Sequence, residues 1–233
     1  MYYGYYYDPT YIFIVIGFLI TLLAQAWVNG SYSKYKKIGN HRGISGQEVA
    51  RKILDANGLS NVKVVEVAGT LTDHYDPTKK QISLSTDIYR DSSVASMAVA
   101  AHECGHAIQD KVGYTFLRIR HKIVPTVNLC TKLGYFVIFI GFLFGFFEIA
   151  MIGFILLCAI LLFQLVTLPV EFNASKRAKE QLKQLEIADE RGNSGVRNML
   201  TAAAMTYVAS LASTLLQLFR MLLIILSRRR NDN

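Results

Sequence analysis

The amino-acid sequence predicts an α+β membrane protein, in which a short sheet and a motif-bearing helix are combined with about three transmembrane helices and a further apolar C-terminal helix. Three observations support this fold class. Hydrophobic residues make up 52% of the 233 residues, and the mean hydropathy is positive, which is unusual for a soluble domain. Long apolar runs lie near both ends of the chain and in its third quarter. Residues 30–132, in contrast, are mostly polar.

The first apolar run, residues 11–28, has about 18 residues, which is enough for a helix to cross a bilayer. No basic residue precedes it, and three lysines follow it: Lys34, Lys36 and Lys37. Basic residues concentrate on the cytoplasmic side of membrane helices. We therefore expect residues 1–29 to form an outer, tyrosine-rich N-terminus and the first transmembrane helix.

The polar segment, residues 30–132, is predicted to be a cytoplasmic domain that begins with a helix. Ser45 and Glu48 have the spacing of a capping box, in which each side chain binds the backbone of the other residue. Gly58 is a typical stop signal, so the helix should end at about Asn57.

A small sheet should follow this helix. Residues 62–67 are predicted to form a strand, and residues 69–84 a hairpin that turns at residues 76–79. The next helix should begin with Ser92 or Ser93 as its N-cap, because the small and apolar residues 94–101 favour a helix. This helix carries the histidine motif.

Residues 133–170 are predicted to form two antiparallel transmembrane helices that turn near Glu148, because the apolar run is too long for one span. We interpret Glu148 as solvated in an outer turn rather than as a functional carboxylate within the bilayer. Basic residues lie before the second span and after the third. Residues 30–132 and 171–200 should therefore share the cytoplasmic compartment.

Residues 171–233 should contain a segment that contributes to the site, followed by C-terminal helices. Whether residues 201–226 span the membrane is ambiguous. Arg220 would cost about 2.5–3.5 kcal/mol at the centre of a span, and Arg228–Arg230 would end outside. We favour a cytoplasmic or half-embedded helix that covers the site, with the three terminal arginines at anionic headgroups. A spanning helix is the alternative.

The run His102-Glu103-Cys104-Gly105-His106 carries the strongest chemical signal. Two histidines four residues apart lie on one face of a helix, where both can bind one metal ion. The glutamate between them can act as a general base toward water. Cys104 should point away from the metal and pack, and Gly105 should permit a close backbone approach. A chance occurrence of this pattern is the alternative interpretation.

A catalytic zinc ion takes three protein ligands and keeps a position for water, so a third ligand is needed. None of the other three histidines has the spacing that would supply a ligand shortly after the motif. Glu171 is the better candidate, because it follows the third span and should lie on the same membrane face as the motif. A metal would offset the cost of its partial desolvation. An ordinary interfacial glutamate is the alternative. The expected cofactor is one Zn²⁺ per chain.

The segments HECGHAIQD and LPVEFNASKRA together resemble the bacterial neutral zinc membrane metallopeptidases, the YugP-like family. Residues 73–77 and the strand ISLS also match, so the resemblance covers nearly the whole chain. It implies a small zincin-like metallopeptidase domain. The segment Glu171–Ala174 is also similar to that of gluzincins such as the membrane CAAX-type and heat-shock peptidases. Those proteins have an aspartate at the position of Ser175. The residue that steadies a ligand histidine is therefore left open between Asn173, Ser175 and Asp110.

These features predict a membrane-anchored zinc metalloendopeptidase of gluzincin type. His102, His106 and Glu171 would hold zinc, a zinc-bound water would attack the peptide bond at the cytoplasmic membrane face, and Glu103 would be the general base. His74 and Tyr207 are candidates for stabilising the oxyanion.

The expected location is the bacterial cell membrane, in a multi-pass arrangement with the N-terminus outside. Proteins or peptides are the expected substrates, membrane proteins among them. The net charge is +8, and the basic residues cluster beside the apolar segments. The sequence contains no nucleic-acid-binding motif. We therefore expect the bilayer as partner and no nucleic acid.

Two other functions are compatible with a histidine motif in a membrane protein. A non-catalytic membrane scaffold or assembly partner could retain a structural metal site, but such a site has no need of Glu103. An intramembrane site-2-type protease needs the motif inside a long apolar helix and an aspartate ligand from another span. Here the motif helix is bracketed by polar residues and no apolar run contains an aspartate. The peptidase at the membrane face is therefore the favoured function.

Overall fold

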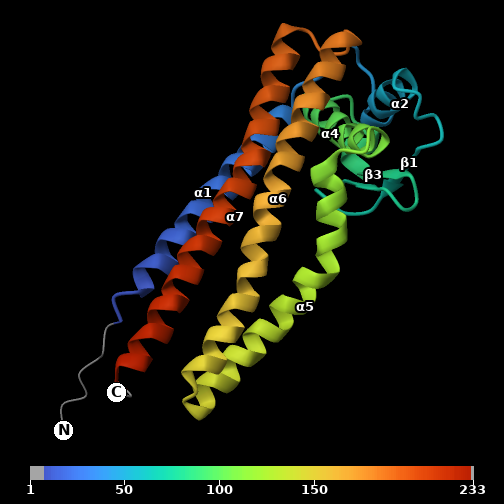
Figure 1. Cartoon of the computed structure of the whole chain (residues 1–233). Helices are drawn as coiled ribbons and strands as arrows, with labels where there is room; N and C mark the ends of the chain where they lie inside the picture. The colour runs from blue at the N-terminus through green and yellow to red at the C-terminus, as the bar shows by residue number, and fades with distance from the viewer. Residues whose placement is uncertain (1–7, 232–233) are drawn as a thin grey trace. The chain divides into compact units, whose positions relative to one another are not determined.

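The computed structural model describes residues 8–231, so the predicted outer N-terminal tyrosines before residue 8 lie outside the described residues. Within that range the chain forms long helices and one small sheet, which confirms the α+β fold class (Figure 1). The elements are α1 (Tyr11–Lys36), α2 (Gly46–Ala56), β1 (Lys63–Val67), β2 (His74–Asp76), β3 (Gln81–Ser85), α3 (Thr86–Arg90), α4 (Val94–Lys111), α5 (Thr115–Phe144), α6 (Phe147–Gln184) and α7 (Glu190–Asn231).

The chain divides into two compact units. We call one the helical unit; it consists of Met1–Ala24, Arg120–Val166 and Tyr207–Asn233. We call the other the motif unit; it consists of Gln25–Ile119 and Thr167–Thr206. The histidine motif and Glu171 both belong to the motif unit.

Helices α1, α5, α6 and α7 are each long and apolar enough to cross a membrane. The break between α5 and α6 falls at residues 145–146, so Glu148 lies in the first turn of α6. The sequence favoured a C-terminal helix that does not span, yet α7 is a fourth candidate span by length and composition. Arg220 of α7 has partners within the helical unit: it lies 3.6 Å from the Asp8 carboxylate and 4.6 Å from the centre of the Tyr11 ring. These contacts offset part of the cost that argued against a span. The structure does not describe the side chains of Arg228–Arg230.

The sheet of the motif unit has the strand order β1-β3-β2. The predicted hairpin is present: β2 and β3 pair antiparallel, with Tyr75 opposite Ile82. The predicted strand at residues 62–67 forms β1, which pairs parallel to β3, with Val65 opposite Ser83. The central strand β3 is therefore buried, while β1 and β2 are the two edges.

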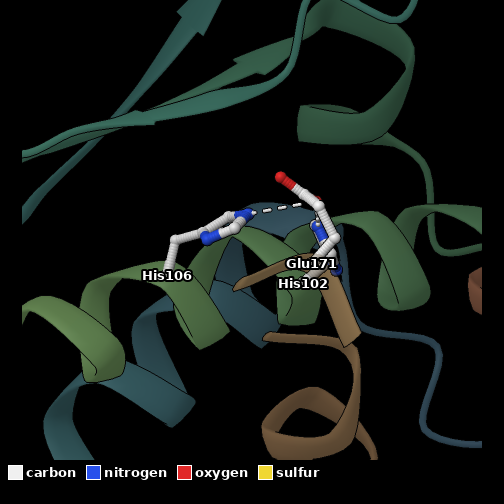
Figure 2. Close-up of side chains that lie close together, drawn as sticks. All are labelled: His102, His106 and Glu171. Carbon is white, nitrogen blue, oxygen red and sulfur yellow. Dashed lines mark ion pairs between the residues drawn. The ribbon is translucent and has the colours of Figure 1, made fainter. Parts of the chain in front are cut away.

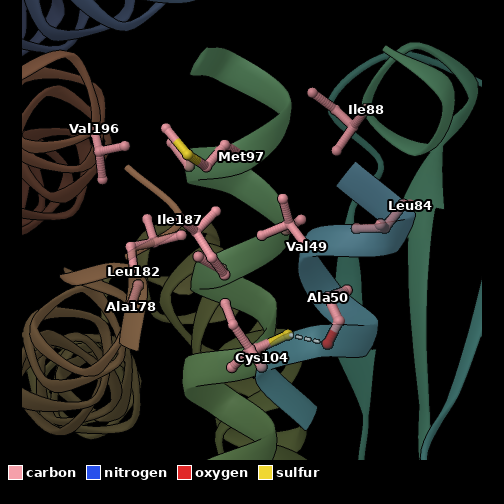
Figure 3. Packing of buried hydrophobic residues seen from close by; sticks show 14 of the residues in the cluster. Val49, Ala50, Leu84, Ile88, Met97, Cys104, Ala178, Leu182, Ile187 and Val196 are labelled. Carbon is pink, nitrogen blue, oxygen red and sulfur yellow. Dashed lines mark hydrogen bonds between the residues drawn. The ribbon is translucent and has the colours of Figure 1, made fainter. Parts of the chain in front are cut away.

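Helix α4 lies in the hydrophobic core of the motif unit, where its buried residues form one cluster with residues of α2 and α6. Figure 3 shows part of this cluster, with Val49 from α2, Met97 from α4 and Leu182 from α6. Each of these side chains is almost completely buried. Burial of a side chain of this size stabilises the fold by about 1.5–3 kcal/mol. The core therefore holds α4 rigidly, which matters because α4 carries the motif.

The capping box predicted at the start of α2 is confirmed. The Ser45 side chain accepts a hydrogen bond from the Glu48 backbone N–H, and the Ser45 backbone N–H donates to the Glu48 carboxylate over 2.7 Å. The helix ends at Ala56, and Gly58 has a positive φ of 62°. This conformation suits glycine, which has no Cβ to clash.

Replacing Ser45 with alanine is expected to destabilise the motif unit by about 0.5–2 kcal/mol, because the first turn of α2 loses its cap. Thermal melting of the detergent-solubilised protein measures the effect. Ser33→Ala, at an exposed position in α1, is the control and should melt like the wild type. Equal melting of all three proteins would show that this cap contributes nothing to stability.

Candidate metal centre

Of the two serines that the sequence offers as N-cap of α4, Ser93 is the one that caps it: its side chain accepts a hydrogen bond from the Ser96 backbone N–H over 3.1 Å. The helix continues without a break to Lys111, so His102 and His106 lie one turn apart. Their rings are 4.8 Å apart, measured between centroids, and meet almost at right angles. Both imidazoles can therefore direct a ring nitrogen toward one point above this face of α4.

Glu171 reaches that same point from α6. Its Oε2 atom lies 3.3 Å from His102 Nε2 and 3.7 Å from His106 Nε2 (Figure 2). The Glu171 side chain is only 4% exposed, and the two histidines are largely buried. Among the residues that the structure describes, no other group of three metal-ligating side chains gathers this closely.

The spacing of these three groups fits zinc. In a tetrahedral site with bonds of about 2.0–2.2 Å, neighbouring ligand atoms are separated by about 3.4 Å. The two carboxylate–imidazole distances are close to this value, and all three ligand atoms lie within 4.8 Å of one another. Two imidazole nitrogens and a carboxylate oxygen are also the donor set of several catalytic zinc sites.

Negative charge gathers around the second histidine. Burial by itself would lower the pKa of His106, but its hydrogen bond with Glu171 and the charges of Glu103 and Glu171 act in the opposite direction, and the pKa is raised overall. Glu103 itself is only 7% exposed. The site therefore favours a cation, and a metal ion would take the place of the proton.

The approach of α6 to α4 depends on Gly105. A Cβ atom added at Gly105 would lie 2.5 Å from the backbone oxygen of Ala174, well inside contact distance. The sequence-based prediction that Gly105 permits a close backbone approach is thus confirmed. Because Ala174 follows Glu171 by three residues on α6, this contact sets how near the Glu171 carboxylate comes to the histidines.

Cys104 points away from the site, as predicted. Its Sγ atom is fully buried and lies 3.5 Å from the backbone oxygen of Ala50 in α2 (Figure 3). Burial raises the pKa of this thiol, so it stays protonated and packs as a small apolar group.

Comparison with known proteins agrees with this geometry. Residues 10–226 match the model of a family described as "Putative neutral zinc metallopeptidase". The chain belongs to this family. It is also 42% identical over 220 residues to the "Putative membrane protease YugP" of Bacillus subtilis (strain 168), which covers 94% of this chain and 98% of that protein. No solved structure matches the present chain significantly.

Family membership confirms the resemblance inferred from the motifs and identifies Zn²⁺ as the cofactor. It also indicates a protease that acts on peptides or proteins. His102, His106 and Glu171 form the group in this zinc peptidase that can hold the ion. The four apolar helices agree with a membrane protein.

The residues that contact the histidines from behind are only partly those expected. Among the three residues that the sequence left open, Ser175 contacts a histidine: its Oγ lies 3.3 Å from His102 Nδ1. His106 Nδ1, however, lies 3.0 Å from the side-chain oxygen of Gln109, which sequence reasoning missed. The available signal was its spacing: Gln109 follows His106 by three residues, and such side chains are neighbours on a helix. Asn173 is bonded to Gln109 rather than directly to a histidine in these contacts.

Asp110, the third candidate for this task, contacts the β2–β3 hairpin. Its carboxylate accepts a hydrogen bond from the Tyr75 hydroxyl over 2.7 Å and pairs with the ammonium of Lys80. Both partners belong to the β2–β3 hairpin or its turn. Asp110 therefore ties the hairpin to the C-terminal part of α4.

The two oxyanion candidates lie in different units. His74 is exposed at the start of β2, and its Nδ1 lies 2.8 Å from the backbone oxygen of Thr72. When Nδ1–H donates to this carbonyl, Nε2 carries a hydrogen only if the ring is protonated. Tyr207 belongs to the helical unit, where its side chain is 37% exposed. The structure thus brings His74, and not Tyr207, into the unit that holds the motif.

Proposed function

We propose that this protein is a membrane-anchored zinc endopeptidase of gluzincin type, with His102, His106 and Glu171 as metal ligands and Glu103 as general base. The observation that carries the proposal is the position of the Glu171 carboxylate, which extends from α6 and lies at distances from both histidines that suit one zinc ion. A zinc ion bound there would polarise the scissile carbonyl and lower the pKa of a water molecule to about 7.

Glu103 supplies the proton transfers in this proposal. Its carboxylate takes a proton from the attacking water as the water oxygen bonds to the carbonyl carbon. It then gives the proton to the leaving nitrogen as the carbon–nitrogen bond breaks, so that a carboxylic acid and an amine result. The position of Glu103 supports this role, because it is the residue after His102 in the motif on α4. A protonated His74 is a candidate donor to the oxyanion, and Tyr207 remains the other.

We further propose that the motif unit faces the cytoplasm and the N-terminus lies outside. The support is the distribution of charge: Lys34, Lys36 and Lys37 end α1, and a basic segment from Arg118 to Lys122 begins α5. In this arrangement residues 1–29 hold the first span, residues 30–132 the cytoplasmic domain, residues 133–170 two spans, and residues 171–233 the third ligand and the C-terminal helices. Substrates would be peptides or proteins at that membrane face, membrane proteins included.

Glu103→Gln tests the function. We expect cleavage of an unstructured peptide to fall by about 10²–10⁴-fold, because the amide cannot accept the proton. Zinc should stay bound at one ion per chain, since Glu103 is not a ligand. Activity is measured on detergent-purified protein, and metal content by elemental analysis.

Glu180→Gln is the matched control, because Glu180 is an exposed carboxylate on α6 that pairs only loosely with Lys176 at 3.8 Å. It should retain wild-type cleavage. Equal cleavage by the wild type and Glu103→Gln would refute Glu103 as the base. A wild type that binds zinc without cleaving any peptide would favour the non-catalytic scaffold, and one without zinc would refute the metal site.

A further inference from the structure

Gln109 is a polar side chain with no exposure to solvent, placed in α4 between the second motif histidine and the end of the helix. A buried amide is destabilising unless both its oxygen and its nitrogen have partners. Gln109 has three. Its Oε1 lies 3.0 Å from His106 Nδ1, and its Nε2 donates to the backbone oxygen of Val170 over 2.8 Å and to Asn173 Oδ1 over 3.0 Å.

These partners determine the orientation of the amide. The backbone oxygen of Val170 can only accept a hydrogen bond, so the NH₂ group of Gln109 must face it. Oε1 must then face His106, and it too can only accept. His106 Nδ1 therefore has to carry a hydrogen, which leaves the lone pair of the neutral ring on Nε2. Nε2 is the atom that lies 3.7 Å from Glu171 Oε2.

The same amide also holds the helix that carries the third ligand. Val170 immediately precedes Glu171 on α6, and its backbone oxygen is the atom that Gln109 binds. Asn173 follows Val170 by three residues on α6. Its Oδ1 accepts the second hydrogen of the Gln109 amide and a hydrogen bond from Arg177 Nε over 2.8 Å. Gln109 thus connects a histidine of α4 to the backbone and to a side chain of α6 on both sides of Glu171.

His102 has no equivalent arrangement. Its Nδ1 lies 3.3 Å from the hydroxyl of Ser175, which is longer than the corresponding contact of His106. A hydroxyl can donate or accept, so it does not select one tautomer of the ring. The control over ring orientation and tautomer therefore rests on the second histidine.

From this geometry we infer that Gln109 is a positioning residue of the metal centre: it directs the Nε2 lone pair of His106 toward the metal and holds Glu171 in register with it. The inference rests on the proposed zinc site. Gln109 is then the residue that couples α4 to α6 at the metal centre.

Gln109→Met tests this role, because methionine has a similar length and no hydrogen-bonding amide. We expect its zinc dissociation constant, measured by competition with a chromophoric chelator, to rise by about 10–100-fold, as is usual when a partner of a ligand histidine is removed. The visible absorption bands of the Co²⁺-substituted protein should also change, because the ring is no longer held at one angle.

Gln181→Met is the matched control, since Gln181 is a part-buried amide on α6 that accepts a hydrogen bond from Asn57 over 2.6 Å. It should bind zinc like the wild type and show the wild-type Co²⁺ bands. Wild-type zinc affinity and an unchanged Co²⁺ spectrum in Gln109→Met would overturn the inference.

A second measurement needs no variant. Nitrogen-15 histidine NMR of the zinc-loaded wild type should show His106 bound through Nε2 with a protonated Nδ1. Binding through Nδ1 would overturn the inference even if Gln109→Met did not fold. A wild type that binds zinc but cleaves no peptide would refute the peptidase and leave the role of Gln109 standing. A wild type that binds no zinc would refute both.

Discussion

Replacing Glu171 with glutamine is expected to remove zinc from the protein while leaving its helices folded. Glutamine has nearly the same shape but carries no charge, and a neutral amide is a much poorer zinc ligand than a carboxylate. Glu171 is buried and lies within 3.7 Å of both histidines, so no water-exposed carboxylate can easily take its place. The loss of zinc affinity should exceed the roughly 10–100-fold that follows removal of an outer partner.

Elemental analysis of detergent-purified protein measures this loss, and circular dichroism reports whether the helices persist. Glu180→Gln changes an exposed carboxylate nine residues further along α6 and should keep a full complement of zinc. Full zinc occupancy in Glu171→Gln would show that another residue is the third ligand.

Gly105→Ala is expected to have the second large effect. The new methyl group would lie 2.5 Å from the backbone oxygen of Ala174, so α4 and α6 would have to move apart. Overpacking of this kind costs about 1–3 kcal/mol. The movement would also separate Glu171 from His102 and His106, which should weaken zinc binding and peptide cleavage together.

Gly30→Ala is the control for this experiment, because no atom lies within 4 Å of a Cβ added at that position of α1. Alanine there should be neutral or stabilise the helix by about 0.5–1 kcal/mol. Melting temperature, zinc content and cleavage are measured for both variants. A Gly105→Ala protein that matches the wild type in all three would show that the helices can separate without consequence.

Local features of the fold could be predicted because their determinants are close together in sequence. The capping box at Ser45, the N-cap at Ser93 and the hairpin around Asp76 each depend on residues within a few positions of one another. The motif histidines belong to the same class, since a spacing of four on a helix is enough to bring them together. Glu171 could be anticipated from membrane topology, which needs only the order of apolar and basic segments.

Other features could not be predicted from the sequence, because they depend on how separate elements are oriented relative to one another. The parallel pairing of β1 with β3 joins strands that are not consecutive, and no local pattern specifies it. The tolerance of Arg220 within α7 depends on Asp8, more than 200 positions away in the chain. Asp110 was one of three candidates for contacting a ligand histidine, and no local pattern shows that the hairpin gives it Tyr75 and Lys80 as partners.

By itself, the sequence determined the chemical identity of this protein: a zinc-binding motif, a candidate third ligand and the apolar segments of a membrane protein. Only the tertiary structure decided how the candidate ligands are held. The rotation of α6 against α4 is set by the contact of Gly105 with Ala174 and by the hydrogen bonds of Gln109, which join positions more than 60 residues apart. Such contacts depend on angles between helices to within a fraction of a turn, and sequence periodicity does not encode these angles.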